Sequence, residues 1–86
     1  MNNKVLVKLY VPMIEKSYDV WIPINKKIST IITLLVKGIS DLNKGCYQPK
    51  SLPTLYNKET SEEYDINLKV INTNIRNATE LILIWK

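Results

Sequence analysis

The sequence contains no histidine, one cysteine and only two glycines. Without histidine, Ser-His-Asp and Cys-His catalytic arrangements are excluded, and the usual set of zinc ligands is incomplete. The glycines, Gly38 and Gly45, are too isolated to form a glycine-rich phosphate-binding loop. These absences predict a protein that is not an enzyme and that has no cofactor.

The single cysteine, Cys46, has no partner for an internal disulfide, which is typical of a reducing compartment. We expect it to be a buried structural thiol rather than a nucleophile. No apolar run approaches the ~20 residues that a membrane span needs. The first eight residues also lack the long apolar segment of a secretory signal. The sequence therefore predicts a cytoplasmic protein without membrane insertion.

The net charge of +4 comes from the first part of the chain. Residues 1–50 contain eight Lys or Arg against three Asp or Glu, whereas residues 51–86 contain four against five. The lysines are spread singly, and only Lys26 and Lys27 are adjacent. A nucleic-acid footprint is usually more clustered, so this charge indicates a solubilising surface.

Four carboxylates lie close together in the second half: Glu59, Glu62, Glu63 and Asp65. A metal site is one interpretation of this cluster. However, the segment lacks the supporting carbonyl and glycine positions of a calcium loop. We therefore expect a solvated acidic edge, which also discourages edge-to-edge pairing of sheets.

A length of 86 residues bounds the chain to one domain, 1–86, with one core. Its first half begins with two alternating segments, residues 4–11 and 17–24, which predict two strands. The inward-facing positions are the odd ones of the first segment and the even ones of the second: Val5, Val7, Leu9, Val11, Tyr18, Val20, Ile22 and Ile24.

In the next segment, the β-propensity of the residues and the spacing of the apolar residues predict different structures. Residues 28–36 are rich in β-branched side chains, which favour a strand. Apolar residues nevertheless recur at helical spacing from Ile28, and Gly45 stands where a C-cap glycine is expected. We therefore predict a helix from Ile28 to Asn43. Its apolar stripe consists of Ile28, Ile31, Ile32, Leu35, Ile39 and Leu42.

In the second half, residues 46–53 are predicted to form a loop. Three short strands follow, over residues 54–57, 62–66 and 81–84. Between the last two strands, residues 68–75 are predicted to form a 3₁₀ turn or short loop that fills the core. The first and last strands are the most apolar, which suits adjacent central positions in a mixed sheet. The predicted fold is α+β in the order β-β-α-β-β-β, with one helix packed across the sheet.

This order resembles the ubiquitin-like β-grasp over nearly the whole chain. The local similarity is best in Leu68-x₂-Ile71-x₃-Ile75-x₃-Thr79-x-Leu81-x-Leu83. The segment 55–60, followed by Glu80-Leu-Ile-Leu-Ile84, is similar to small bacterial ubiquitin-like proteins of the YukD/EsaB family. The resemblance implies an accessory or regulatory role beside the type VII (WXG100) secretion machinery, with a secretion ATPase or a membrane component as partner.

The sequence ends in Trp85-Lys86, whereas conjugated ubiquitin-like proteins end in Gly-Gly. Conjugation needs a C-terminal glycine carboxylate that can enter the narrow site of an activating enzyme. A lysine carboxylate behind an indole ring does not fit such a site. We therefore expect a protein that is not conjugated to targets.

The alternate positions of the predicted strands that face away from the helix carry large apolar side chains. In β-grasp order these side chains should form one patch: Leu6, Tyr10, Trp21, Tyr56, Ile82 and Ile84. By resemblance, Tyr10, Tyr56 and Ile84 fall near the recognition patch of ubiquitin. Such a patch predicts a protein partner or a weak homodimer contact. Alternatively, the stems of Lys4 and Lys8 cover the rings, or one strand has the opposite parity.

A second class of function uses the same face. Lys4 and Lys8, beside the rings of Tyr10, Trp21 and Tyr56, suit a sheet on which single-stranded bases stack. The aliphatic residues of the patch oppose this interpretation because bases need flat partners. We therefore favour a protein partner. A β-grasp adaptor of another pathway is a further alternative.

Overall fold

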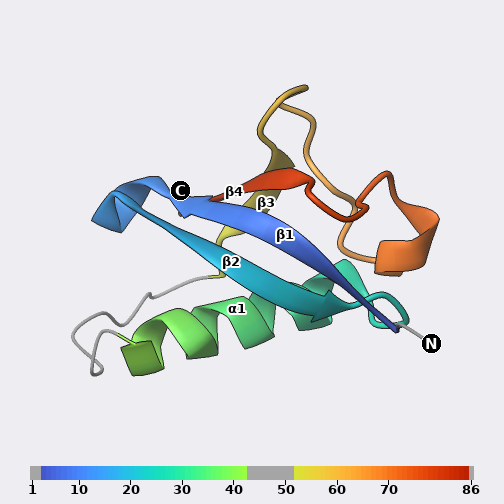
Figure 1. Ribbon diagram of the computed structural model, residues 1–86, viewed down its shortest axis with the longest axis horizontal. Helices are drawn as coiled ribbons and strands as arrows, with labels where there is room; N and C mark the ends of the chain where they lie inside the picture. The colour runs from blue at the N-terminus through green and yellow to red at the C-terminus, as the bar shows by residue number, and fades with distance from the viewer. Residues whose placement is uncertain (1–2, 43–51, 86) are drawn as a thin grey trace.

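The computed structural model describes residues 3–42 and 52–85. Within these residues the chain forms four strands, one α-helix and two 3₁₀ turns: β1 (Lys4–Val11), η1 (Pro12–Ile14), β2 (Lys16–Pro23), α1 (Ile28–Leu42), β3 (Thr54–Asn57), η2 (Val70–Asn72) and β4 (Glu80–Ile84). The helix lies across one face of the sheet, and the other face has no helix over it (Figure 1). This arrangement confirms the α+β prediction.

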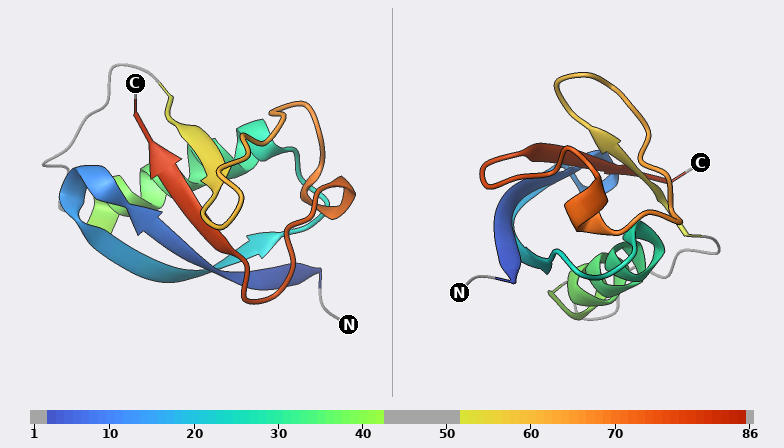
Figure 2. Two further views of the ribbon diagram at one scale, coloured as in Figure 1. Left: turned by 90° about the horizontal axis from the view of Figure 1, so that it is seen from above. Right: turned by 90° about the vertical axis from the view of Figure 1, so that its right-hand side faces the viewer.

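The sheet has the strand order β2-β1-β4-β3. β1 pairs antiparallel with β2 and parallel with β4, with Leu9 opposite Leu81 in the parallel pair. β3 pairs antiparallel with β4. The views in Figure 2 show β1 and β4 side by side in the middle of the sheet. The predicted central position of the two most apolar strands is therefore confirmed.

Helix α1 buries the predicted stripe, because Ile28, Ile31, Ile32, Leu35 and Ile39 are each at most 6% exposed. Packing against the sheet thus outweighs the local β-propensity of this segment. The side chain of Leu42, the end at Asn43, the cap at Gly45 and the burial of Cys46 lie outside the described residues.

One predicted strand does not form. Residues 62–66 pair with β3 only through an isolated bridge between Tyr56 and Glu63. Immediately afterwards the chain turns, because the side chain of Asp65 accepts a hydrogen bond from the Asn67 N–H at 2.8 Å. The Leu68 N–H also donates to the Asp65 carbonyl. Local side-chain bonding of aspartate competes with a sheet ladder, and here it ends the pairing.

The long connection between β3 and β4 closes the core as predicted. Val70, in η2, and Ile75 are both almost fully buried. The segment is anchored to the start of α1, because Ile28 and Ser29 donate backbone hydrogen bonds to the carbonyls of Leu68 and Ile66. These bonds satisfy two of the first N–H groups of the helix, which have no partner within it.

A polar cluster lies at the edge of this core. The hydroxyl of Tyr64 donates to Asn74 Oδ1 at 2.6 Å and accepts from Asn57 Nδ2 at 2.9 Å. Asn57 Oδ1 in turn accepts from the N–H groups of Glu59 and Thr60, which closes the turn after β3. Burial of Tyr64 raises the pKa of its phenol above the ordinary value of 10.0, so the hydroxyl keeps the proton that it donates to Asn74 to a higher pH than an exposed tyrosine would.

Candidate functional site

The face of the sheet turned away from α1 carries the side chains that alternation predicts there. The residues between them along the strands, such as Val7, Leu9, Leu55 and Leu81, are buried against the helix. The outward set retains partial or full exposure, and two of its members are clearly exposed, Trp21 at 58% and Ile84 at 37%. The structure therefore places all six residues on the outer face: Leu6, Tyr10, Trp21, Tyr56, Ile82 and Ile84.

At one end of this face, Leu6 of β1 lies opposite Trp21 of β2. The two side chains are neighbours across the strands, so the indole ring has an aliphatic surface beside it. The ring is 58% exposed. A large aromatic side chain thus remains open to solvent at this end of the face.

At the other end, Tyr10, Ile82 and Tyr56 lie in one row across β1, β4 and β3. Lys58 covers part of this row, because its Nζ lies 5.6 Å from the centre of the Tyr10 ring. The same Nζ is 3.8 Å from Glu80 Oε1. A lysine that the sequence patterns did not single out, Lys58, therefore lies over Tyr10.

A charged row separates these two ends. Lys8 lies opposite Asp19 on one side and opposite Glu80 on the other. Because residues four apart on a strand are about 13 Å apart, Leu6 and Tyr10 do not touch across this row. The outer face therefore carries two apolar groups with charges between them, where the strand order alone predicts one continuous patch.

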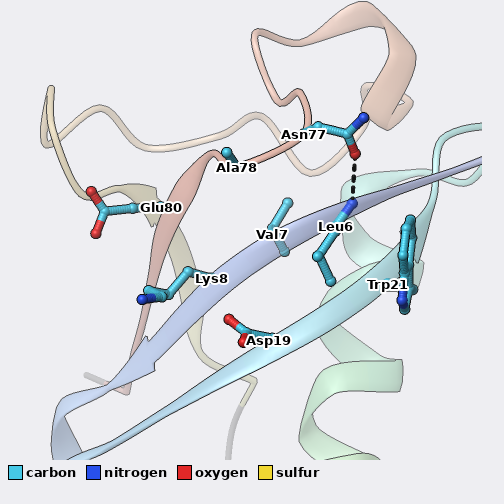
Figure 3. A pocket seen from close by; sticks show the side chains of 8 residues that line it. All are labelled: Leu6, Val7, Lys8, Asp19, Trp21, Asn77, Ala78 and Glu80. Atoms are coloured by element: carbon cyan, nitrogen blue, oxygen red, sulfur yellow. Dashed lines mark hydrogen bonds between the residues drawn. The ribbon is translucent and has the colours of Figure 1, made fainter.

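A pocket of about 500 Å³ opens at the Leu6–Trp21 end of the face. Figure 3 shows Leu6 between the loop that carries Asn77 and the ring of Trp21, with the charged row along the opposite side. The lining residues are Leu6, Val7, Lys8, Asp19, Trp21, Asn77, Ala78 and Glu80.

The turn before β4 builds one wall of this pocket. Asn77 Oδ1 accepts from the Leu6 N–H at 2.9 Å, and the Ala78 N–H donates to the Leu6 carbonyl at 2.8 Å. Ala78 adopts a left-handed conformation with φ of 74°. The turn is held by Thr79, whose Oγ1 accepts from the Arg76 N–H. Sequence reasoning missed Asn77 and Ala78 because their position depends on contact with a strand 71 residues away.

The described residues offer little other chemistry. No group of three or more metal-ligating side chains occurs among them. The carboxylates of Glu59, Glu62, Glu63 and Asp65 are exposed, as expected for a solvated edge. In the part of the chain that the structure describes, no helix is both long and apolar enough to cross a membrane. The outer face with its pocket is the most distinctive surface.

No protein-family model matches the sequence, and no curated protein is significantly similar to it. Among solved structures, the chain is similar to the EccD5 ubiquitin-like domain from Mycobacterium xenopi, with 15% identity, a TM-score of 0.75, and 95% of this chain and 93% of that domain covered. The ubiquitin-like domain of the Mycobacterium tuberculosis type VII secretion system protein EccD1 matches with 13% identity, a TM-score of 0.74, and coverage of 99% and 100%.

A chain in the structure of a toluene 4-monooxygenase complex also matches, with 6% identity, a TM-score of 0.79, and coverage of 96% and 99%. Identities this low show a common fold and nothing finer. The fold itself is the ubiquitin-like β-grasp, as the strand order, the parallel central pair and the single helix already indicate.

Proposed function

We propose that this chain is a ubiquitin-like protein-interaction module that serves type VII secretion as an accessory or regulatory component. It binds a protein partner, a secretion ATPase or a membrane component, through the outer face of its sheet. The observation that carries this proposal is the pocket beside the exposed Trp21. The similarity to two ubiquitin-like domains of secretion proteins supports the pathway.

Trp21 is suited to anchor a partner. It is 58% exposed, stands next to Leu6 and borders a pocket that a partner side chain can enter. Burying the exposed part of a tryptophan contributes about 3–4 kcal/mol of gross hydrophobic free energy. Association itself costs about 4–15 kcal/mol. The balance favours a weak, reversible contact, which suits regulation better than permanent assembly.

The charged row sets the chemistry of the partner at the rim of the pocket. Two carboxylates, Asp19 and Glu80, stand beside two cations, because Lys8 lies between them and the Nζ of Lys58 is 3.8 Å from Glu80. The row therefore has no excess of positive charge to attract the phosphates of a nucleic acid, and carboxylates remain available to a partner. They are compatible with a protein that presents an apolar side chain to Trp21 and a basic residue beside it. The geometry thus favours a protein partner over single-stranded nucleic acid.

The test is affinity capture from the native cytoplasm at low and at high salt, with bound molecules identified by mass spectrometry. We expect a type VII secretion ATPase or membrane component that stays bound at high salt, because apolar contacts are little affected by ionic strength. With the purified partner, Trp21→Ala should weaken binding at least ~30-fold, which is the loss expected for a hot-spot residue.

Ile71→Ala provides the matched control, since Ile71 is a similarly exposed apolar residue in η2, outside the outer face. This variant should bind like the wild type. Both variants should remain folded because both side chains are largely exposed. Recovery of nucleic acid that washes off with salt, or of only a second copy of the chain, would contradict the proposal.

A further inference from the structure

A second surface lies at the end of the molecule where α1 begins, and it shares no residue with the outer-face pocket. Figures 1 and 2 show the connection around η2 next to the first turn of this helix. An isolated antiparallel bridge joins Lys27 to Lys69 there. Lys26 directly precedes Lys27, and all three lysines are exposed. The fold therefore gathers lysines that come from distant parts of the sequence.

The backbone pairing at this bridge brings two of the cations close together. The residues that follow the two lysines, Ile28 and Val70, donate N–H hydrogen bonds across the bridge at 2.8 and 3.0 Å. Lys27 and Lys69 are therefore a non-hydrogen-bonded pair, in which the Cβ atoms are about 4.5–5.5 Å apart. Like charges directly opposite each other are unfavourable. Among the described residues, none of the three lysines has an ion-pair partner that would neutralise it.

The start of α1 makes this concentration of charge still less favourable. The N-terminal end of a helix carries a partial positive charge, so acidic side chains are preferred there. The first turn of α1 has no acidic residue. The N–H groups of Ile28 and Ser29 are already bonded to backbone carbonyls, so they are not available to a single bound phosphate. The lysines therefore act as point charges on an open surface, and the chain keeps them at a cost to its own stability.

Exposed aliphatic side chains stand beside these lysines. Ile66 and Leu68 are both exposed, and their carbonyls accept the hydrogen bonds of the first N–H groups of α1. Segments 24–30 and 65–72 contain one acidic residue, Asp65, and no aromatic residue. Single-stranded nucleic acid would need aromatic rings on which its bases stack. Lysines next to exposed aliphatic side chains instead suit a lipid surface, where cations meet anionic headgroups and aliphatic groups reach the acyl boundary.

We propose that this end of the molecule binds the surface of an anionic lipid bilayer. Lys26, Lys27 and Lys69 lie against the phosphates of the headgroups. Ile66 and Leu68 enter the boundary between the headgroups and the acyl chains. The contact is peripheral and reversible, because each lysine near an anionic surface strengthens binding only about fivefold. This surface is separate from the outer-face pocket and does not depend on the function proposed above.

The probe is a vesicle of phosphatidylglycerol, compared with a vesicle of phosphatidylcholine, which has no net charge. Sedimentation of the purified chain with the vesicles should show saturable binding to phosphatidylglycerol that weakens as salt is added, and far weaker binding to phosphatidylcholine. Lys27→Glu should weaken binding about 30-fold, because it changes the local charge by two units. Lys16→Glu is the matched control. It makes the same change in net charge at the exposed start of β2, at the opposite end of the molecule, and should bind nearly like the wild type (Figure 1).

Two measurements separate lost binding from lost structure. Lys27→Glu removes the like-charge pair and places a carboxylate before α1, so its Tm should be at least that of the wild type. Lys69→Gln, which removes one charge from the other segment, should weaken binding about fivefold. The proposal is overturned by absence of binding to phosphatidylglycerol, by equal binding to both lipids, or by equal binding of Lys27→Glu and Lys16→Glu. Tighter binding to an oligothymidine strand than to the vesicles also overturns it, because the occupant would then be a nucleic acid.

Discussion

At the scale of single residues, Tyr64 shows how one hydroxyl organises two segments. It joins Asn57 at the end of β3 to Asn74 in the connection to β4, and the ring is 6% exposed. A buried amide that loses its partner pays the desolvation cost without the bond. The residue therefore holds the long connection against the sheet at the place where a regular strand fails to form.

Replacing Tyr64 by phenylalanine should reduce the free energy of unfolding by about 1–3 kcal/mol, because the Asn57 amide is left without its acceptor. Chemical denaturation at pH 7 measures this loss. Asn67→Ala is a control outside the cluster. An unchanged stability would mean that the three side chains do not form the network in solution.

The same substitution changes the response to alkaline pH. The raised pKa of Tyr64 means that the folded state holds the phenol proton more tightly than the unfolded state. Its contribution to stability is therefore complete below about pH 10 and is lost as the pH rises through the folded-state pKa. Denaturation curves above pH 10 should show a steeper loss for the wild type than for Tyr64→Phe.

At the scale of elements, the helix contains a position that is not optimised for helix stability. Gly38→Ala should increase the free energy of unfolding by about 0.5–1 kcal/mol, since alanine loses less backbone entropy and its Cβ has open space. Thermal unfolding measures the gain as an increase in Tm. A decrease in Tm would mean that the space beside Gly38 is filled in solution and that the added methyl group clashes.

The elements also show what sequence patterns can and cannot determine. Alternation along β1 and β2 predicted which side chains face the helix, because the side chains at these positions are buried or partly buried in each strand. Helical spacing correctly overruled β-propensity in α1. The strand over 62–66 was wrong because Asp65 forms a local turn that alternation does not reveal.

Sequence patterns could predict only part of the candidate site. Trp21 and Leu6 follow from parity, but their separation from Tyr10 by a charged row depends on the register between strands. Asn77 enters the site through a contact with Leu6, which is distant in sequence. The patterns of a single sequence carry no information on the register between strands or on contacts between distant segments.

At the scale of the whole molecule, the strand order predicts a hierarchy of local stability. β1 has a neighbour on each side, whereas β2 has one. Amide hydrogen exchange should therefore be slowest in β1 and should alternate along β2, with Tyr18 and Val20 protected and Ser17 and Asp19 exchanging fast. Uniform protection along β2 in the isolated protein would contradict an open edge.

The parallel pairing of β1 with β4 has a consequence for how the chain acquires this structure. In the order of synthesis, β4 comes well after the β1–β2 hairpin and helix α1, although it pairs directly with β1. Until then, Leu9 and its buried neighbours lack the strand that fills the centre of the sheet. Closing so long a loop is entropically costly and is rewarded only when β4 docks. Folding should therefore be all-or-none, and during synthesis the native sheet cannot form until β4 has left the ribosome.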